Sequence, residues 1–291
     1  MIASALLAGL ALGSMYGLLA LGFHVTYAVS GTVNFAQGSA MMLGAVFAYA
    51  LIVVLGWPVV PAVLAALALC ALYGLLVEAA AVRPFVRRGS SAWLIATVAL
   101  GIVVDNAVLF TFGKEPRSLP SPLAVTPLSI GGASLGIYPL QAIIPAAGVA
   151  LAAALDAVAK RTRLGVAMLA VVQNREAASL MGIDTSRAVA AAYAISAVLA
   201  GIAGMLIAPL FNVNADMGTL FGLKAFAVAI LGGIASAWGV MAAGILFGIA
   251  EALITSTLGS GYTQILTFAM VIVVLAWRPH GLFGRAAAKK V

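Results

Sequence analysis

The chain has 291 residues, of which 64% are apolar and only 8% are charged, whereas about a quarter of the residues in a soluble domain are charged. Its net charge is +7, and no charge-rich tract of domain length interrupts the apolar sequence. These values exclude a soluble catalytic domain and predict a single membrane domain over residues 1–291. The basic residues lie in the connections between apolar runs, so the positive charge does not indicate nucleic-acid binding.

The apolar runs predict an all-α, polytopic membrane protein. The first 77 residues contain no Asp, Glu, Lys or Arg, which is enough for about three spans of about 20 residues each. The N-terminus has no basic region and no clear cleavage site, so we expect a retained first span and not a removable signal peptide. About eight clear spans are expected, at residues 3–27, 36–56, 59–82, 92–112, 138–159, 187–209, 239–258 and 262–277.

Three basic connections set the expected orientation. They lie around Arg83, between residues 160 and 187, and after Arg278, and basic loops are typically cytoplasmic. The N-terminus is then expected outside and the C-terminus in the cytoplasm, which requires one further crossing. Residues 223–238 are the candidate, and their apolar part is too short for a regular span, so we expect a short or broken crossing buried among other helices. The proline-rich connection at 113–137 is expected to be ordered loop or turn.

A polar break separates the first two apolar runs. It contains Asn34 and Gln37 within residues 34–38, with glycines at both ends. At membrane depth, such a break must face a cavity or partner helices, as discontinuous helices do in solute sites. At the membrane surface it would be only a loop, and periodicity alone leaves both alternatives open.

Charged residues inside apolar runs are the other candidates, because a charge within a span is costly. Glu78 lies close enough to Arg83 to predict a local ion pair near a span end. Asp105 and Asn106 fall in the middle of the fourth run, where a polar pair facing the bundle would line a solute path or tie helices together.

Lys224 and Glu251 have opposite charges on neighbouring segments, so a structural ion pair and a role in transport are both open. Glycines recur at helix-packing spacing at Gly9, Gly13, Gly17, Gly244 and Gly248, which predicts close helix contacts. No phosphate-loop, zinc or nucleophile motif is present. We therefore predict no catalytic site, no metal site and no enzyme activity, and expect any energy input to come from another subunit.

The connection after the fifth run contains a predicted short helix. Asn174 suits its N-cap, Glu176 its first turn and Gly182 its C-terminal end. The spacing of Ala177, Leu180 and Met181 places them on one apolar face. This face would either enter a groove of a partner protein or rest on lipid headgroups. The predicted docking residues are Asn174, Arg175, Glu176, Ala177, Ala178, Leu180, Met181, Gly182 and Ile183.

Six motifs in order resemble the permease subunits of high-affinity branched-chain amino acid ABC transporters, of the LivH type. They are LGSMYGLLALG at 12–22, NFAQG at 34–38, RP at 83–84, NREAASLMGI at 174–183, LKAFAVAILGGI at 223–234 and GIAEAL at 248–253. The resemblance covers nearly the whole chain, and six motifs together are far more specific than any one of them.

The resemblance implies a subunit of a bacterial inner-membrane importer. Its partners would be a second related permease, two cytoplasmic ATPases that bind ATP and Mg, and a periplasmic solute-binding protein, with membrane lipid around the helices. The chain itself would bind no cofactor. Residues 174–183 would be the coupling helix that docks on an ATPase, and alternating access would use a path lined by residues 34–38 and 223–234.

One departure concerns the solute. The family often carries His where this chain has Gln37, so urea, short amides and other small acids are alternatives to a branched-chain amino acid. A passive channel for a small polar solute is the alternative from another class. The residues expected along the path are Asn34, Gln37, Asp105, Asn106, Lys224 and Glu251.

Overall fold

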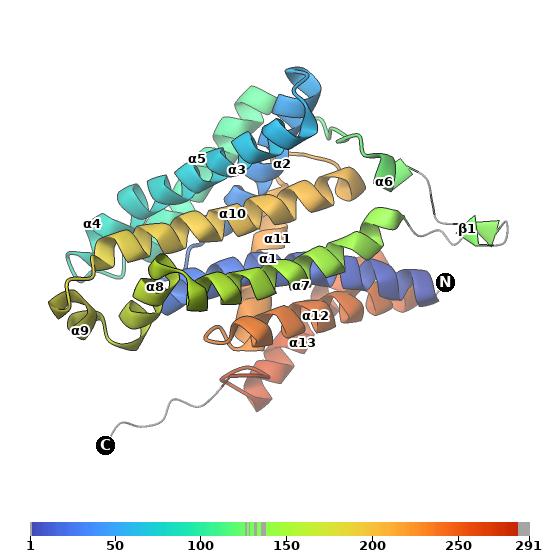
Figure 1. The fold of residues 1–291 in the computed structure, drawn as a ribbon. Coiled ribbons are helices and arrows are strands. Elements are labelled where there is room, and N and C mark those ends of the chain that lie inside the picture. Colours follow the sequence, from blue (N-terminus) through green and yellow to red (C-terminus); the bar gives the residue numbers. More distant parts are fainter. Residues whose placement is uncertain (1, 126, 128, 131–132, 135–137, 285–291) are drawn as a thin grey trace. The chain divides into compact units, whose positions relative to one another are not determined.

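The computed structural model describes residues 2–125, 127, 129–130, 133–134 and 138–284, most of which are helical (Figure 1). The helices are α1 (Ile2–Ser30), α2 (Gln37–Tyr49), α3 (Val59–Val77), α4 (Arg83–Val86), α5 (Trp93–Phe112), α6 (Pro122–Val125), α7 (Pro139–Arg161), α8 (Arg163–Gln173), α9 (Arg175–Leu180), α10 (Thr185–Phe211), α11 (Met217–Gly232), α12 (Ala237–Leu258) and α13 (Ser260–Trp277). Two short strands, β1 (Ser129–Ile130) and β2 (Ala133–Ser134), pair antiparallel.

The predicted eight spans are confirmed within the described residues. Eight helices are long and apolar enough to cross a membrane: Ala5–Ser30, Gln37–Val54, Val59–Val86, Trp93–Phe112, Pro139–Arg161, Thr185–Phe211, Ala237–Leu258 and Ser260–Trp277. The third is longer than expected because the π-helical segment Glu78–Val82 joins α3 to α4. Pro84 lacks an amide hydrogen and its ring would clash in a regular helix, so the wider π-turn before it lets the helix continue.

The candidate for a further crossing differs from its predicted bounds. It is α11, an unbroken apolar helix of 16 residues that begins six residues before Leu223, and its crossing of the membrane stays a prediction. Its length of about 24 Å is short for a hydrocarbon core of about 30 Å. The predicted end at Trp238 was wrong, because Gly233 turns the chain with φ +81° and Ser236 caps α12 by accepting a hydrogen bond from the Gly239 amide.

The connection at 113–137 contains only one helical turn, α6, and the β1–β2 pair among its described residues. Gly131 and Gly132 lie outside the described residues. The start of this connection is held by a backbone pair, in which the amides of Arg117 and Val213 donate to each other's carbonyl oxygens at 2.9 and 2.7 Å. The loop prediction is therefore confirmed for the described part.

Contacts group the chain into two compact units. Unit 1 comprises Met1–His24, Pro122–Ala152 and Lys224–Val291, and unit 2 comprises Val25–Ser121 and Ala153–Leu223. In unit 1, α1 packs closely on α12 through the predicted glycines. A Cβ atom added at Gly13 would lie 2.6 Å from the Gly244 carbonyl oxygen, and one at Gly9 would lie 2.8 Å from that of Gly248. The packing role of this glycine pattern is thus confirmed.

The core of unit 2 is formed by α10 lying against α2 and α3 (Figure 1). Glycines again bring the backbones together. A Cβ atom added at Gly44 of α2 would collide with Gly201 of α10, and one at Gly74 of α3 would collide with the Tyr193 carbonyl. Because these helices touch at their backbones, the polar side chain of Gln37 at the start of α2 can reach α10 directly.

Candidate functional site

The polar break between α1 and α2 is enclosed in unit 2. α1 ends at Ser30, and Gly31 follows with φ +69°, a conformation that glycine adopts without strain. Asn34 accepts a hydrogen bond from the Ala36 amide at 3.1 Å, a side-chain turn that leads into α2. Asn34 and Gln37 are fully buried. The break is therefore buried within the protein, and its depth in the membrane stays a prediction.

Gln37 ties this break to α10. Its Nε2 donates to the Ser196 carbonyl oxygen at 3.0 Å, and its Oε1 accepts from the Ser196 hydroxyl at 2.8 Å. Asn34 Nδ2 donates to the same Oε1 at 3.4 Å. The Gln37 amide is thus used on both its oxygen and its nitrogen, and buried amides need such partners.

A chain of hydroxyl groups makes a second tie. Ser30 donates to the Thr26 carbonyl at 2.6 Å, and its oxygen lies 2.5 Å from the Thr32 hydroxyl. The Thr32 hydroxyl lies 2.7 Å from that of Tyr193 on α10. Since Ser30 uses its hydrogen on Thr26, Thr32 must donate to Ser30 and Tyr193 to Thr32. This chain of hydrogen bonds holds the C-terminal end of α1 against α10.

Sequence reasoning missed Tyr193 and Ser196, because both lie inside a long apolar run. Their spacing of three residues places them on one face of α10. A polar stripe on an otherwise apolar span is the signal that would have identified them. This stripe faces the polar break and supplies hydrogen-bond partners to Thr32 and Gln37.

Asp105 on α5 lies beside the start of α11. The Thr219 hydroxyl donates to its Oδ2 at 3.4 Å, while its Oδ1 is buried and has no hydrogen-bond partner among the described residues. The Ser39 hydroxyl donates to the Gly101 carbonyl one turn away at 3.4 Å, so α5 approaches α2 here. A buried carboxylate oxygen without a donor can accept one from a solute or water.

Asn106 does not share this environment. Its side chain is exposed on the other side of α5, and its Nδ2 donates to the Ile102 carbonyl of its own helix at 2.8 Å. Consecutive helical residues point about 100° apart, so the two cannot face the same neighbours. The predicted polar pair is therefore split, with only Asp105 directed into the unit.

Lys224 and Glu251 form an ion pair in unit 1, which was one of the two alternatives left open by the sequence. Lys224 Nζ lies 2.5 Å from Glu251 Oε1, and their side chains are 14% and 10% exposed. The ammonium also lies 3.4 Å from the Tyr16 hydroxyl, a partner that the sequence did not reveal. The Tyr16 ring packs edge-on against Phe247 of α12, with the ring centroids 5.7 Å apart. This cluster joins α1, α11 and α12.

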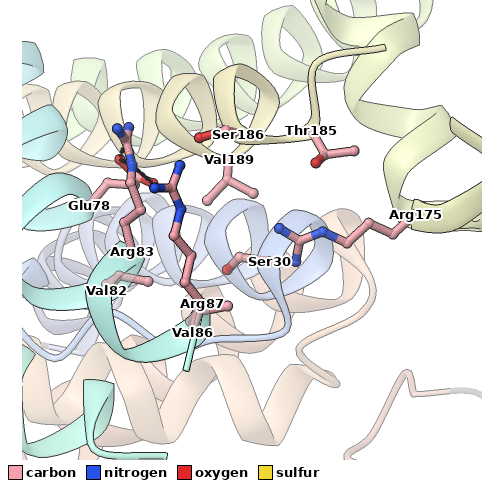
Figure 2. Close-up of a pocket in the computed structure, with 10 residues that line it drawn as sticks. All are labelled: Ser30, Glu78, Val82, Arg83, Val86, Arg87, Arg175, Thr185, Ser186 and Val189. Carbon is pink, nitrogen blue, oxygen red and sulfur yellow. Dashed lines mark hydrogen bonds and ion pairs between the residues drawn. The ribbon is translucent and has the colours of Figure 1, made fainter. Parts of the chain in front are cut away.

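Glu78 and Arg83 form the second predicted ion pair, which Figure 2 shows at the end of a span. Arg83 Nη2 donates to Glu78 Oε2 at 2.6 Å and Arg83 Nε donates to Oε1 at 3.0 Å, a forked geometry. The Glu78 side chain is 3% exposed and that of Arg83 is 37% exposed. The acid is thus buried while its partner reaches the surface.

The predicted short helix after the fifth span is α9. The Asn174 side chain caps it by accepting from the Ala177 amide at 3.0 Å. At its other end Gly182 has φ +83°, and the amides of Ile183 and Gly182 donate to the carbonyls of Ala178 and Ser179 at 3.0 Å. These two bonds define a Schellman motif. Both predicted caps are confirmed.

The exposed face of α9 is apolar, as its spacing predicts. Leu180 is 87% exposed and Met181 is 83% exposed, with Ala177 exposed beside them, whereas Ala178 is buried. The preceding helix, α8, was not predicted. Thr162 caps it, and Gly165 lies against the backbone of Ala159 in α7, which allows the sharp turn between the two helices.

Comparison with known proteins places these features in a family. A family described as "Branched-chain amino acid transport system / permease component" matches residues 5–275. The chain belongs to this family. The matched range includes every candidate residue above.

Three curated relatives show how far the permease resembles known subunits. It is 34% identical to the high-affinity branched-chain amino acid transport system permease protein LivH of Escherichia coli K12, over 97% of this chain and 96% of LivH. It is 31% identical to BraD of Pseudomonas aeruginosa over the same shares. LivM of E. coli K12 is 30% identical over 42% of this chain and 29% of LivM. No solved structure matches the permease.

Family membership and the eight apolar helices identify the permease as a multi-pass membrane protein of branched-chain amino acid transport. The named relatives are transport subunits, which agrees with the absence of enzyme motifs. The partial likeness to LivM shows that this permease is also related to a second type of permease in such systems.

Proposed function

We propose that this permease is the membrane subunit of an ATP-binding-cassette importer that moves a branched-chain amino acid, or a similar small polar solute, into the cytoplasm. The solute class follows that of the relatives LivH and BraD, which are named as branched-chain amino acid permeases. The exposed apolar face of α9 carries the coupling part of the proposal, because two large apolar side chains on a rigidly capped helix match a helix that enters a groove.

The proposed partners are a second permease of the LivM type, two cytoplasmic ATPases and a periplasmic solute-binding protein. The ATPases bind ATP and Mg, and this chain binds no cofactor. Nucleotide-driven closure of the ATPases moves α9 as a rigid body and so drives alternating access. α9 and the basic connections face the cytoplasm of a bacterial inner membrane, with the N-terminus outside and the C-terminus inside.

Within unit 2, Asp105 is the residue we place along the solute path. An amino acid carries an ammonium group, and the unpaired Oδ1 of Asp105 is an acceptor that such a group would satisfy. Asn34 and Gln37 already bond to each other and to α10, so we propose that they shape the path by holding α2 and the break in place. Lys224 and Glu251 neutralise each other's charge through Glu251 Oε1, while Glu251 Oε2 is buried without a hydrogen-bond partner among the described residues. We propose that this pair mainly ties helices together.

The first experiment is co-purification of the tagged permease expressed with the genes that neighbour its own, followed by ATPase assays. Recovery of two ATPases and a second permease, with hydrolysis stimulated by leucine-loaded binding protein, is the expected result. Stimulation only by urea or an amide would keep the importer and change the solute. Recovery of the chain without any ATPase would contradict the proposal, and solute flux through the chain alone in liposomes would favour a passive channel.

Asp105 is tested by a matched pair of neighbouring variants. Asp105→Asn keeps the shape and the Thr219 bond but removes the charge, and we expect at least tenfold slower uptake with normal subunit recovery. Asn106→Ala lies on the other face of α5 and should leave uptake within about twofold. Equal uptake by both variants would remove Asp105 from the path.

A further inference from the structure

A basic pocket lies at the ends of three spans in unit 2. It has a volume of about 210 Å³ and is lined by Ser30, Glu78, Val82, Arg83, Val86, Arg87, Arg175, Thr185, Ser186 and Val189 (Figure 2). The first span ends at Ser30, the third ends at Val86 and the sixth begins at Thr185. Because spans end near the level where hydrocarbon meets headgroups, we expect the pocket at headgroup level whichever side of the membrane it faces.

The charge of the pocket selects an anion. Its lining contains three arginines and one glutamate, a formal net charge of +2. Glu78 is engaged by Arg83. Among the described residues no carboxylate pairs with Arg87 or Arg175. Two guanidinium groups therefore have donors available for a ligand.

The geometry brings these arginines in from two elements. Arg87 follows α4 and Arg175 begins α9, and Figure 2 shows Arg87 beside the Glu78–Arg83 pair and Arg175 reaching across toward Ser30. The hydroxyl-bearing residues Thr185 and Ser186 line the same space from the first turn of α10. Asp184, which caps α10, already accepts from two backbone amides and pairs with Arg187, so it is not the partner that the pocket arginines lack.

We propose that this pocket binds the phosphate group of an anionic phospholipid, with Arg87 and Arg175 as its main ligands. Guanidinium groups match phosphate oxygens in forked geometry, and basic pockets between spans at the membrane surface suit anionic headgroups. The volume admits a phosphate with part of its glycerol. A headgroup held by both arginines joins α4 to α9, so bound lipid should restrain α9 relative to the span ends.

Lipid binding to the purified full chain tests the proposal without measuring transport. Binding of phosphatidylglycerol and of phosphatidylcholine is titrated by native mass spectrometry at low salt, because salt screens such contacts. We expect phosphatidylglycerol to bind at least tenfold more tightly. In Arg87→Gln/Arg175→Gln its affinity should fall about thirtyfold, the loss expected for two surface arginines.

A matched double variant controls for net charge. Arg88→Gln/Arg163→Gln removes two exposed arginines that do not line the pocket, and its affinity should stay within about twofold of the wild type. Arg87→Lys/Arg175→Lys keeps the charge and should retain part of the binding. Equal losses in the two glutamine variants, or no preference for phosphatidylglycerol in the wild type, would overturn the site.

Competition by soluble phosphates shows whether the pocket binds a lipid headgroup or a soluble phosphate ester. Inorganic phosphate and glycerol 3-phosphate are added as competitors against phosphatidylglycerol. No competition at millimolar concentration supports a lipid ligand, since the acyl chains then contribute to binding. Displacement of the lipid by micromolar glycerol 3-phosphate would overturn the assignment to lipid in favour of a soluble phosphate ester at the same arginines.

Discussion

Two ion pairs, Lys224–Glu251 and Glu78–Arg83, use the same chemistry in different surroundings. Lys224 and Glu251 are both nearly enclosed, at 14% and 10% exposure, and meet through a single contact of 2.5 Å. Glu78 is more deeply buried, at 3%, but Arg83 is 37% exposed and binds it through a fork. In the first pair, loss of either partner strands a charge, whereas Arg83 can turn to water if its partner is removed.

This difference teaches that burial of one acid does not by itself measure its importance to the fold. The cost of losing one partner depends on whether the remaining charged side chain can reach water or another counter-ion. The enclosed pair also contacts the Tyr16 hydroxyl and joins three helices, while Glu78 and Arg83 lie only five residues apart on one continuous helix. The enclosed pair should therefore dominate stability.

The largest expected effect follows removal of one charge from the enclosed pair. Glu251→Gln leaves the Lys224 ammonium without its counter-ion, and we expect a loss of about 3–5 kcal/mol in the free energy of unfolding. The melting temperature and the yield of purified chain measure it. The double variant Lys224→Met/Glu251→Leu removes both charges and should recover most of the loss. A double variant as unstable as Glu251→Gln would show that the pair is needed for more than charge balance.

Gln37 sharpens the comparison because it is buried and neutral. Gln37→Leu leaves the Ser196 hydroxyl and carbonyl without their partner, which should cost about 1–3 kcal/mol. Ser196→Ala removes only the hydroxyl and should cost about 1 kcal/mol. Thermal unfolding of both purified variants checks the order. If Gln37→Leu destabilises the chain more than Glu251→Gln does, buried hydrogen bonds contribute more to the free energy of unfolding than this buried ion pair does.

Glu78→Gln should have a smaller effect. The glutamine keeps an oxygen for Arg83, and Arg83 can also reach solvent, so we expect a loss of about 1 kcal/mol or less in the free energy of unfolding. Arg83→Met removes the exposed partner and strands the buried acid, and it should destabilise more than Glu78→Gln. The same unfolding assay compares the two, and the reverse order would contradict the account of how this pair differs from the enclosed one.

Most of the fold could be predicted because an apolar run of about 20 residues is a strong and local signal. The bounds of α11 could not, since the apolar stretch at 225–235 continues past a turn that only the φ of Gly233 reveals. α8 was missed because, although apolar, it has only 11 residues and is too short to be recognised as a span. α9 was found because its caps, Asn174 and Gly182, are local signals too.

The candidate site was less accessible to sequence reasoning. Asn34 and Gln37 mark a break in an apolar pattern, but which helix satisfies them depends on packing more than 150 residues away in the chain. Asp105 and Asn106 look alike in sequence. Only the rotation of α5 about its axis shows that Asp105 is half-buried and that Asn106 is exposed. Sequence reasoning assigned Arg87 only a role in orientation and Arg175 a role in docking as well. The pocket that both arginines line could not be predicted, because it forms where three helix ends come together.

The smallest effect on stability is expected at α9, where the effect on assembly should be greatest. Leu180→Ser/Met181→Ser removes two side chains that are more than four-fifths exposed, so the free energy of unfolding should change by less than about 0.5 kcal/mol. If α9 docks on an ATPase, the same variant should lose most of the co-purified ATPase and of the coupled hydrolysis, because large apolar side chains dominate such contacts.

A matched variant on the neighbouring helix separates docking from general surface polarity. Leu169→Ser/Val172→Ser on α8 makes the same kind of change at two apolar side chains that are about two-fifths exposed, and it should leave ATPase recovery within about twofold. Loss of ATPase from both variants would extend the docking surface onto α8. Unchanged recovery and hydrolysis in the α9 variant would refute the coupling assignment, and its apolar face would then be better explained by contact with lipid, where serine substitution should weaken vesicle binding and leave the importer assembled.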